Sequence, residues 1–158
     1  MSRLIFAMLF ALAAPAAAQD AAAGQEKLFS GPMHFCGNLF AMDLAADEKA
    51  SWEPGPDFIL YRLQSRCGGF GIYEGFAPDT FENSHQSVTI RGFPKVERLR
   101  AKDGSYSYLI TLPKSEIQMY LHLYGQVWKG NDTDFALVSR VRIGDAKAIG
   151  CTHPTVQG

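Results

Sequence analysis

The hydrophobic pattern of the chain is clearest in its middle. Residues 58–63 form an apolar run rich in the aromatic and branched side chains that strands favour. Polar residues and paired glycines at 64–69 signal a turn, after which apolar positions return with a period of two over 70–76. This order predicts a β-hairpin that has Cys67 at its tip and glycines along its second strand.

The same strand and turn pattern recurs on both sides of this hairpin. An Asp-Gly dipeptide within 102–105 suits a tight hairpin turn, and 117–124 alternates strictly between apolar and polar positions. The composition of 39–50 also suits a helix, but the surrounding strands favour a strand over 39–44. The prolines of 52–57 predict an irregular connector. The further expected strands are 88–91, 95–100, 106–112 and 135–143.

About eight short strands with evenly spaced turns and little helix are typical of an antiparallel sandwich or a small barrel. The chain has 158 residues, which is the size of a single domain even after removal of an N-terminal signal. We therefore expect a mainly β, single-domain protein. The pattern leaves the choice between a sandwich and a closed barrel open.

The N-terminus has the pattern of a cleaved secretory signal. Arg3 precedes an apolar core at 4–12, and the alanines of 16–18 suit a small-x-small cleavage site before Gln19. The apolar core is much shorter than the roughly 20 residues of a membrane-spanning helix. We therefore expect a soluble periplasmic or secreted protein without membrane insertion after cleavage. The expected organisation is a signal peptide at 1–18, a flexible segment at 19–33, one β-rich domain at 34–153 and a tail at 154–158.

The net charge and the absence of known motifs exclude some classes of function but identify none. With 15 basic and 16 acidic residues the chain is nearly neutral, which argues against nucleic acid or an anionic membrane as its partner. The sequence has no Gly-x-Ser-x-Gly elbow and no Cys-x-x-Cys motif. We therefore expect no catalytic residue and no cofactor, and a hydrolase of unknown class is only the third hypothesis.

Three cysteines, Cys36, Cys67 and Cys151, are an odd number for an exported protein. An oxidising compartment favours one disulfide and one free thiol, but the spacing does not identify the pair. The alternative is a metal site, because an up-and-down order of strands would bring these cysteines and two histidines to one end of the fold. Thiolate and imidazole together bind zinc or copper. The alternative ligands are His34, Cys36, Cys67, Cys151 and His153.

The other candidate site is one face of the 116–128 stretch. Aromatic and polar side chains at its even-numbered positions alternate with apolar ones that would lie on the opposite face. Aromatic residues with polar groups are enriched in ligand pockets and protein interfaces, although they also pack in ordinary, partly buried sheet faces. Two tyrosines of the central hairpin would join this face if the strands adjoin. The expected contact residues are Tyr61, Tyr73, Tyr120, His122, Tyr124 and Trp128.

Together these patterns predict an exported soluble binding module rather than an enzyme. An inward-facing aromatic surface would indicate a carrier of a small apolar or aromatic ligand. An outward-facing one would indicate an extracytoplasmic protein partner, such as an inhibited enzyme. The second hypothesis is a periplasmic metal-binding protein.

The glycines of the hairpin permit either approach of a ligand to the backbone or curvature of the sheet, and we favour curvature.

Overall fold

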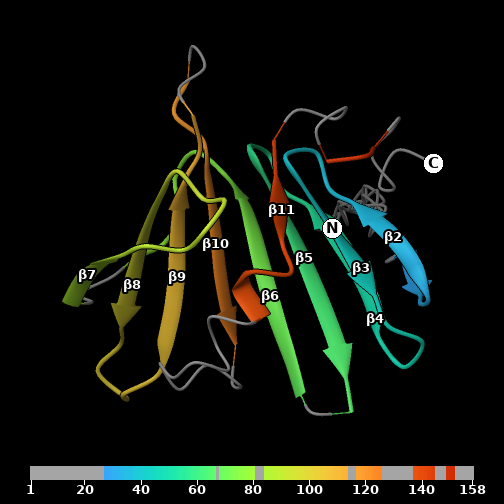
Figure 1. Ribbon diagram of the computed structural model, residues 1–158. Coiled ribbons are helices and arrows are strands. Elements are labelled where there is room, and N and C mark those ends of the chain that lie inside the picture. Colours follow the sequence, from blue (N-terminus) through green and yellow to red (C-terminus); the bar gives the residue numbers. More distant parts are fainter. Residues whose placement is uncertain are drawn as a thin grey trace, which may run out of the picture.

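A computed structural model describes residues 27–66, 68–80, 84–113, 117–125, 137–144 and 149–151. Within these residues, eleven antiparallel strands form two sheets (Figure 1). The strands are β1 (Lys27–Ser30), β2 (Met33–Cys36), β3 (Phe40–Leu44), β4 (Lys49–Pro54), β5 (Phe58–Ser65), β6 (Gly68–Gly75), β7 (Ser84–Val88), β8 (Lys95–Arg100), β9 (Tyr106–Thr111), β10 (Tyr120–Gly125) and β11 (Arg142–Ile143).

The larger sheet has eight strands in the order β1-β4-β5-β6-β10-β9-β8-β7, and the smaller one has the order β11-β3-β2. The predicted central hairpin is confirmed as β5 and β6, which pair over their whole length from Phe58 opposite Gly75 to Ser65 opposite Gly68. Gly68 has a φ of 125° at the turn, a backbone conformation that glycine adopts readily. The hairpin therefore forms the centre of the larger sheet.

The two sheets pack face to face as a sandwich, and the larger sheet does not close into a barrel. The smaller sheet lies over the half of the larger sheet that contains β4, β5 and β6 (Figure 1). Phe35 and Phe40 of the smaller sheet contact the ring of Tyr61 on β5 edge to face, at centroid distances of 6.0 and 4.9 Å. Tyr108 and Leu123 complete the fully buried core. Side chains therefore fill the space between the sheets.

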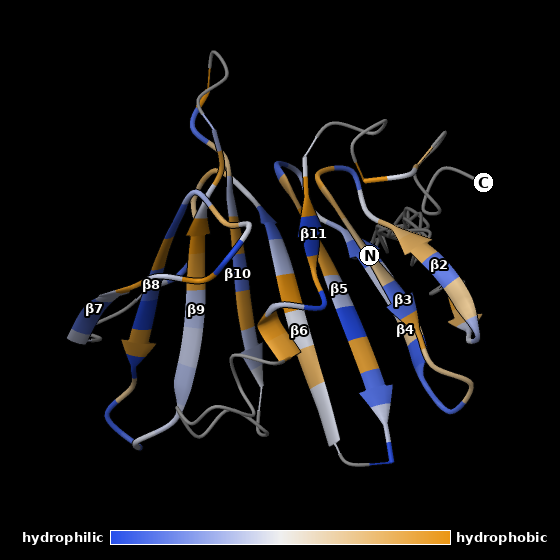
Figure 2. Ribbon diagram, viewed as in Figure 1, coloured by the Kyte–Doolittle hydropathy of each residue, from blue (hydrophilic) through white to orange (hydrophobic). Residues whose placement is uncertain are grey.

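Figure 2 shows that hydrophobic and hydrophilic residues alternate along strands of the larger sheet. This alternation places the two kinds of side chain on opposite faces of the sheet. On β6, fully buried Ile72 faces the core and its half-buried neighbour Tyr73 faces the other way. Within the described residues, no helix is long and apolar enough to cross a membrane.

The N-terminal part of the domain differs from the expectation. The segment 19–33 was expected to be flexible, but its residues 27–30 form β1, which pairs with β4. The reason is that Phe29 packs against Phe35, with ring centroids 5.5 Å apart. The connector predicted over 52–57 is also shorter, because β4 continues to Pro54 at the end of its ladder with β5. Pro54 lies beyond the last residue of β4 that pairs with β1, so its missing N–H removes no hydrogen bond from that ladder.

The C-terminal part differs as well. In place of a long strand over 135–143, the described residues contain turns in which Arg140 and Val141 donate to the carbonyls three residues earlier, followed by the two-residue β11. Val138 and Val141 are buried in the core, and Arg140 forms a 2.6 Å ion pair with Glu48. These long-range contacts outweigh the alternating pattern that predicted a strand.

Tyr61 and Glu74 form a buried polar pair inside the sandwich. The Tyr61 hydroxyl donates to Glu74 Oε2 at 2.8 Å, and the backbone N–H of Asn38 donates to the same oxygen at 3.3 Å. Burial raises the pKa of Glu74 above its usual range. This pair connects the β2–β3 turn of the smaller sheet with the centre of the larger one.

The change Tyr61→Phe is expected to lower the free energy of unfolding by about 1–3 kcal/mol, because it leaves a buried acceptor without its best donor. Urea unfolding of the variant and the wild type at one pH measures the difference. The cost should shrink in a Glu74→Gln background, because a neutral amide is less costly to leave partly unpaired. Equal costs in both backgrounds would show that the hydroxyl stabilises something other than Glu74.

Candidate functional site

The predicted aromatic face lies on β10 and faces away from the core. On this strand Leu121 and Leu123 are fully buried in the core between the sheets, so the alternating residues Tyr120, His122 and Tyr124 belong to the opposite face. This outer face of the larger sheet is continuous with β6, because His122 pairs with Tyr73. The structure therefore brings four of the expected contact residues together.

The other two expected contact residues do not join them. Tyr61 pairs with Ile72 and lies on the inner face, where it is fully buried. Trp128 lies outside the described residues. In place of Tyr61 the outer face contains Phe58, whose ring stacks on Tyr73 at a centroid distance of 5.5 Å. Alternation along the strand could have identified Phe58. Phe58 and Tyr61 are an odd number of positions apart, so their side chains lie on opposite faces of the strand.

We call the resulting surface the outer aromatic patch. It contains side chains from three neighbouring strands, β5, β6 and β10. Tyr124 is 38% exposed, whereas His122 is only 8% exposed. The members of the outer aromatic patch are Phe58, Tyr73, Tyr120, His122 and Tyr124.

Glycines on β6 let two of these rings lie across the sheet. A Cβ atom at Gly71 would stand 2.5 Å from Cζ of Tyr124, and one at Gly75 would stand 2.5 Å from the Tyr73 hydroxyl. Both distances are far shorter than a van der Waals contact, so the rings occupy space that any other residue would fill. The hairpin glycines thus shape the outer aromatic patch, a role beyond the curvature expected for them.

His122 is the most buried member of the outer aromatic patch. Its Nε2 atom lies 2.8 Å from Ser107 Oγ, and its ring lies 5.6 Å from the ring of Tyr124. Burial lowers the pKa of His122 from 6.5 to about 4, partly opposed by the negative charge of Asp79. His122 is therefore neutral at pH 7.

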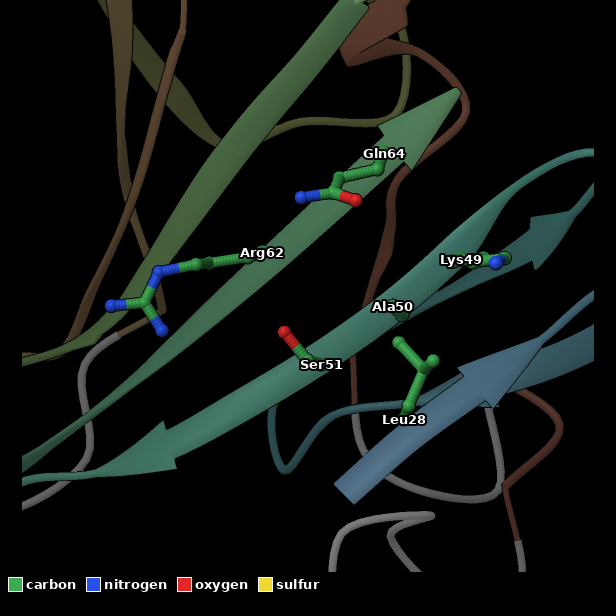
Figure 3. A pocket seen from close by; sticks show the side chains of 6 residues that line it. All are labelled: Leu28, Lys49, Ala50, Ser51, Arg62 and Gln64. Carbon is green, nitrogen blue, oxygen red and sulfur yellow. The ribbon is translucent and has the colours of Figure 1, made fainter. Parts of the chain in front are cut away.

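Two open depressions on the larger sheet are both lined by Arg62 and Gln64 of β5, and the second also includes Tyr124 of the outer aromatic patch. The first has a volume of about 290 Å³ and is shown in Figure 3. The second, of about 260 Å³, extends across β6 to Tyr124 and Gly125. The first depression is lined by Leu28, Lys49, Ala50, Ser51, Arg62 and Gln64.

Basic groups dominate the charge of these depressions. Lys49 and Arg62 both line the first depression, and Arg62 forms a 2.7 Å ion pair with Glu53. Burial raises the pKa of Tyr124 above its usual value, with the positive charge of Arg62 opposing that rise. Tyr124 is therefore a neutral phenol that can donate and accept a hydrogen bond at the edge of a basic hollow.

The second sequence-predicted site, of cysteines and histidines, is partly assembled at the edge of the smaller sheet. Cys36 and Cys151 form a disulfide with a Cα–Cα distance of 6.1 Å, across 115 residues of sequence. His34 lies beside it, with Nε2 3.8 Å from Cys151 Sγ. The two remaining expected ligands, Cys67 and His153, lie outside the described residues.

Two residues that the sequence did not point to complete this corner. His34 Nδ1 lies 2.7 Å from Asp43 Oδ1, and Arg142 Nη2 donates to both Asp43 oxygens at 3.0 Å. The hydrogen bond from His34 and the charge of Arg142 lower the pKa of Asp43. Asp43 is opposite His34 in the β2–β3 ladder and Arg142 comes from β11, so only strand pairing brings them together.

A disulfide and a thiolate metal site use the same sulfur atoms and exclude each other. The oxidised corner is therefore a covalent link between β2 and the C-terminal segment. Its sulfur and imidazole atoms nevertheless all lie within 4.8 Å of one another.

No protein-family model, no curated protein and no solved structure matches the chain.

Proposed function

We propose that the protein is an exported binding module that captures another extracytoplasmic protein on the outer face of its larger sheet. The supporting observation is that the outer aromatic patch faces away from the core and borders an open depression lined by Tyr124 and Arg62, next to a second one lined by Arg62 and Lys49. Aromatic side chains and arginine are the groups that dominate binding energy in protein interfaces. The disulfide is compatible with an oxidising compartment.

The protein partner is favoured over a small-molecule ligand for a geometric reason. A carrier needs an enclosed, mostly apolar cavity that surrounds its ligand. Here the large rings of Phe40, Tyr61 and Tyr108 fill the space between the sheets, and the accessible aromatic surface is the outer one. A flat sheet face with a shallow hollow suits a protein surface better.

The charges suggest what the partner segment contains. Lys49 at the first depression would attract a carboxylate, and Arg62, which also pairs with Glu53, adds a second positive group beside it. Tyr124 lies at the adjoining depression and offers a planar apolar surface. We infer a partner segment with an acidic side chain next to an apolar or aromatic one.

Site-specific photo-cross-linking in the native host tests this proposal. A photoreactive amino acid replaces Tyr124 in one variant and Ser87 on the exposed edge strand β7 in the matched control. The expected result is one protein that is cross-linked at position 124 but not at position 87, identified by mass spectrometry. Equal cross-linking at both positions would contradict a specific surface.

Binding of the purified partner then gives a quantitative prediction. Tyr124→Ala and Arg62→Glu should each weaken the affinity at least about tenfold, which corresponds to about 1.4 kcal/mol. Gly71→Ala should weaken it too, because the added methyl group displaces the Tyr124 ring without removing it. Gln86→Ala on β7 is the matched control and should leave the affinity unchanged. Full affinity in both Tyr124→Ala and Arg62→Glu would overturn the proposal.

A further inference from the structure

The corner at Cys36 and Cys151 contains the parts of a metal site in a form that oxidation blocks. Three ligand atoms of soft or borderline character, two sulfurs and His34 Nε2, lie within 4.8 Å of one another. Two of them come from β2 and the third from the C-terminal segment. This grouping is independent of the outer aromatic patch, which lies on the larger sheet.

One distance in this corner suits zinc. With Zn–S of about 2.3 Å and Zn–N of about 2.0 Å, a tetrahedral ion separates a sulfur from a nitrogen ligand by about 3.5 Å. The observed distance from Cys151 Sγ to His34 Nε2 is 3.8 Å. The imidazole would therefore need little movement relative to Cys151, whereas the two sulfurs, bonded at 2.04 Å in the disulfide, would have to separate to about 3.8 Å.

The surroundings of His34 also match those of a metal ligand. A metal-binding imidazole usually donates its second N–H to a carboxylate, which fixes the ring and raises its basicity. His34 Nδ1 lies 2.7 Å from Asp43 Oδ1, and Arg142 Nη2 donates to both oxygens of that carboxylate at 3.0 Å and lies 2.9 Å from His34 Nδ1. This arrangement directs Nε2 toward the sulfur and toward the backbone carbonyl of Ile149, 3.0 Å away.

The corner is enclosed on the protein side and open on the other. Cys36 and Cys151 are 5% and 6% exposed and pack with Ala41 and Ile149, whereas the His34 side chain is 32% exposed. Three protein ligands and one side toward water are typical of zinc sites that keep an open position.

We propose that reduction of the Cys36–Cys151 disulfide turns this corner into a zinc site formed by both sulfurs and His34 Nε2. A dithiol reductant supplies two electrons and two protons, so the protein gains two thiols while the reductant becomes a cyclic disulfide. Zinc then displaces the two thiol protons and the proton on Nε2 where one is present. Asp43 acts as a positioning residue for His34.

Equilibrium dialysis against Zn²⁺ tests the proposal on the full mature chain. The protein reduced by a phosphine and kept under nitrogen should bind one zinc ion per chain, and the oxidised protein should bind none. His34→Ala should weaken binding at least tenfold, and Asp43→Asn should weaken it about 10–100-fold because the carboxylate no longer orients the imidazole and raises its basicity. His85→Ala and Cys67→Ser are the matched controls and should bind zinc like the wild type.

Two further readouts separate this site from adventitious thiol chemistry. Bound zinc should slow alkylation of Cys36 and Cys151, seen by peptide mass, and Co²⁺ in its place should give thiolate charge-transfer absorption that is reduced in His34→Ala. If reduction unfolds the chain, added zinc should restore the folded circular dichroism spectrum. Zinc binding that is equal in the oxidised protein, unaffected by His34→Ala, lost in Cys67→Ser, or unable to restore the fold would overturn the proposal.

Discussion

Replacing both Cys36 and Cys151 by alanine is expected to lower the free energy of unfolding by about 5 kcal/mol. The disulfide closes a loop with a sequence separation of 115 residues, and the chain-entropy relation for a loop of this length gives about that stabilisation. Such a loss is a large part of the 5–15 kcal/mol that stabilises a typical domain. Urea unfolding of the oxidised wild type and the double variant measures it.

The structure explains why this link has a large effect. Cys151 follows a C-terminal segment whose Ile149 packs with Cys36 and Ala41 in a small buried cluster of its own. Without the covalent link, this small cluster would have to hold the segment by packing and a few hydrogen bonds. Cys67→Ser under the same conditions is the control, and reduced wild type should resemble the double variant. A loss below about 1 kcal/mol would contradict the entropic account.

Acidification should destabilise the protein through His122. Burial lowers the pKa of His122 from 6.5 to about 4, so between these values the unfolded chain binds a proton that the folded chain does not. The free energy of unfolding therefore falls as the pH decreases from about 6.5 toward 4, by about 3 kcal/mol in total. Above pH 6.5 this contribution is fully present.

The variant His122→Gln isolates this effect. A glutamine can retain the hydrogen bond to Ser107 but does not titrate, so its stability should be flatter over the same pH range. Gln86→Ala serves as the surface control, because Gln86 is exposed on edge strand β7 and does not titrate. Urea unfolding at several pH values between 4 and 7 gives both curves, and parallel curves for His122→Gln and wild type would contradict the prediction.

Carboxylates with lowered pKa contribute to acid denaturation in a different range. Ion pairs or hydrogen bonds lower the pKa of each of these groups in the folded protein, so their stabilising contributions are lost only as the pH falls through and below their unfolded values of about 4. These carboxylates therefore act at lower pH than His122, whereas Glu74, whose pKa burial raises, acts in the opposite direction above its unfolded value, so only comparison with His122→Gln assigns the loss to His122. The carboxylates concerned are Asp43, Glu48, Glu97 and Asp103.

The sequence determined the local structure well. Period-two alternation and turn residues identified the β5–β6 hairpin and the strands β8 and β9 almost to the residue, because these patterns depend on neighbours along the chain. The same alternation grouped Tyr120, His122 and Tyr124 on one face. The class of fold, an antiparallel β-protein, followed from these local signals alone.

Tertiary structure decided the features that depend on contacts between residues far apart in the sequence. Which face of a strand is buried depends on the sheet packed against it, and so Tyr61 entered the core while Phe58 joined the outer aromatic patch. The pairing of Cys36 with Cys151, and the placement of Arg142 beside Asp43, likewise depend on contacts between residues about 100 positions apart. Such contacts form only when the sheets pack, because burial and strand pairing act across space rather than along the chain.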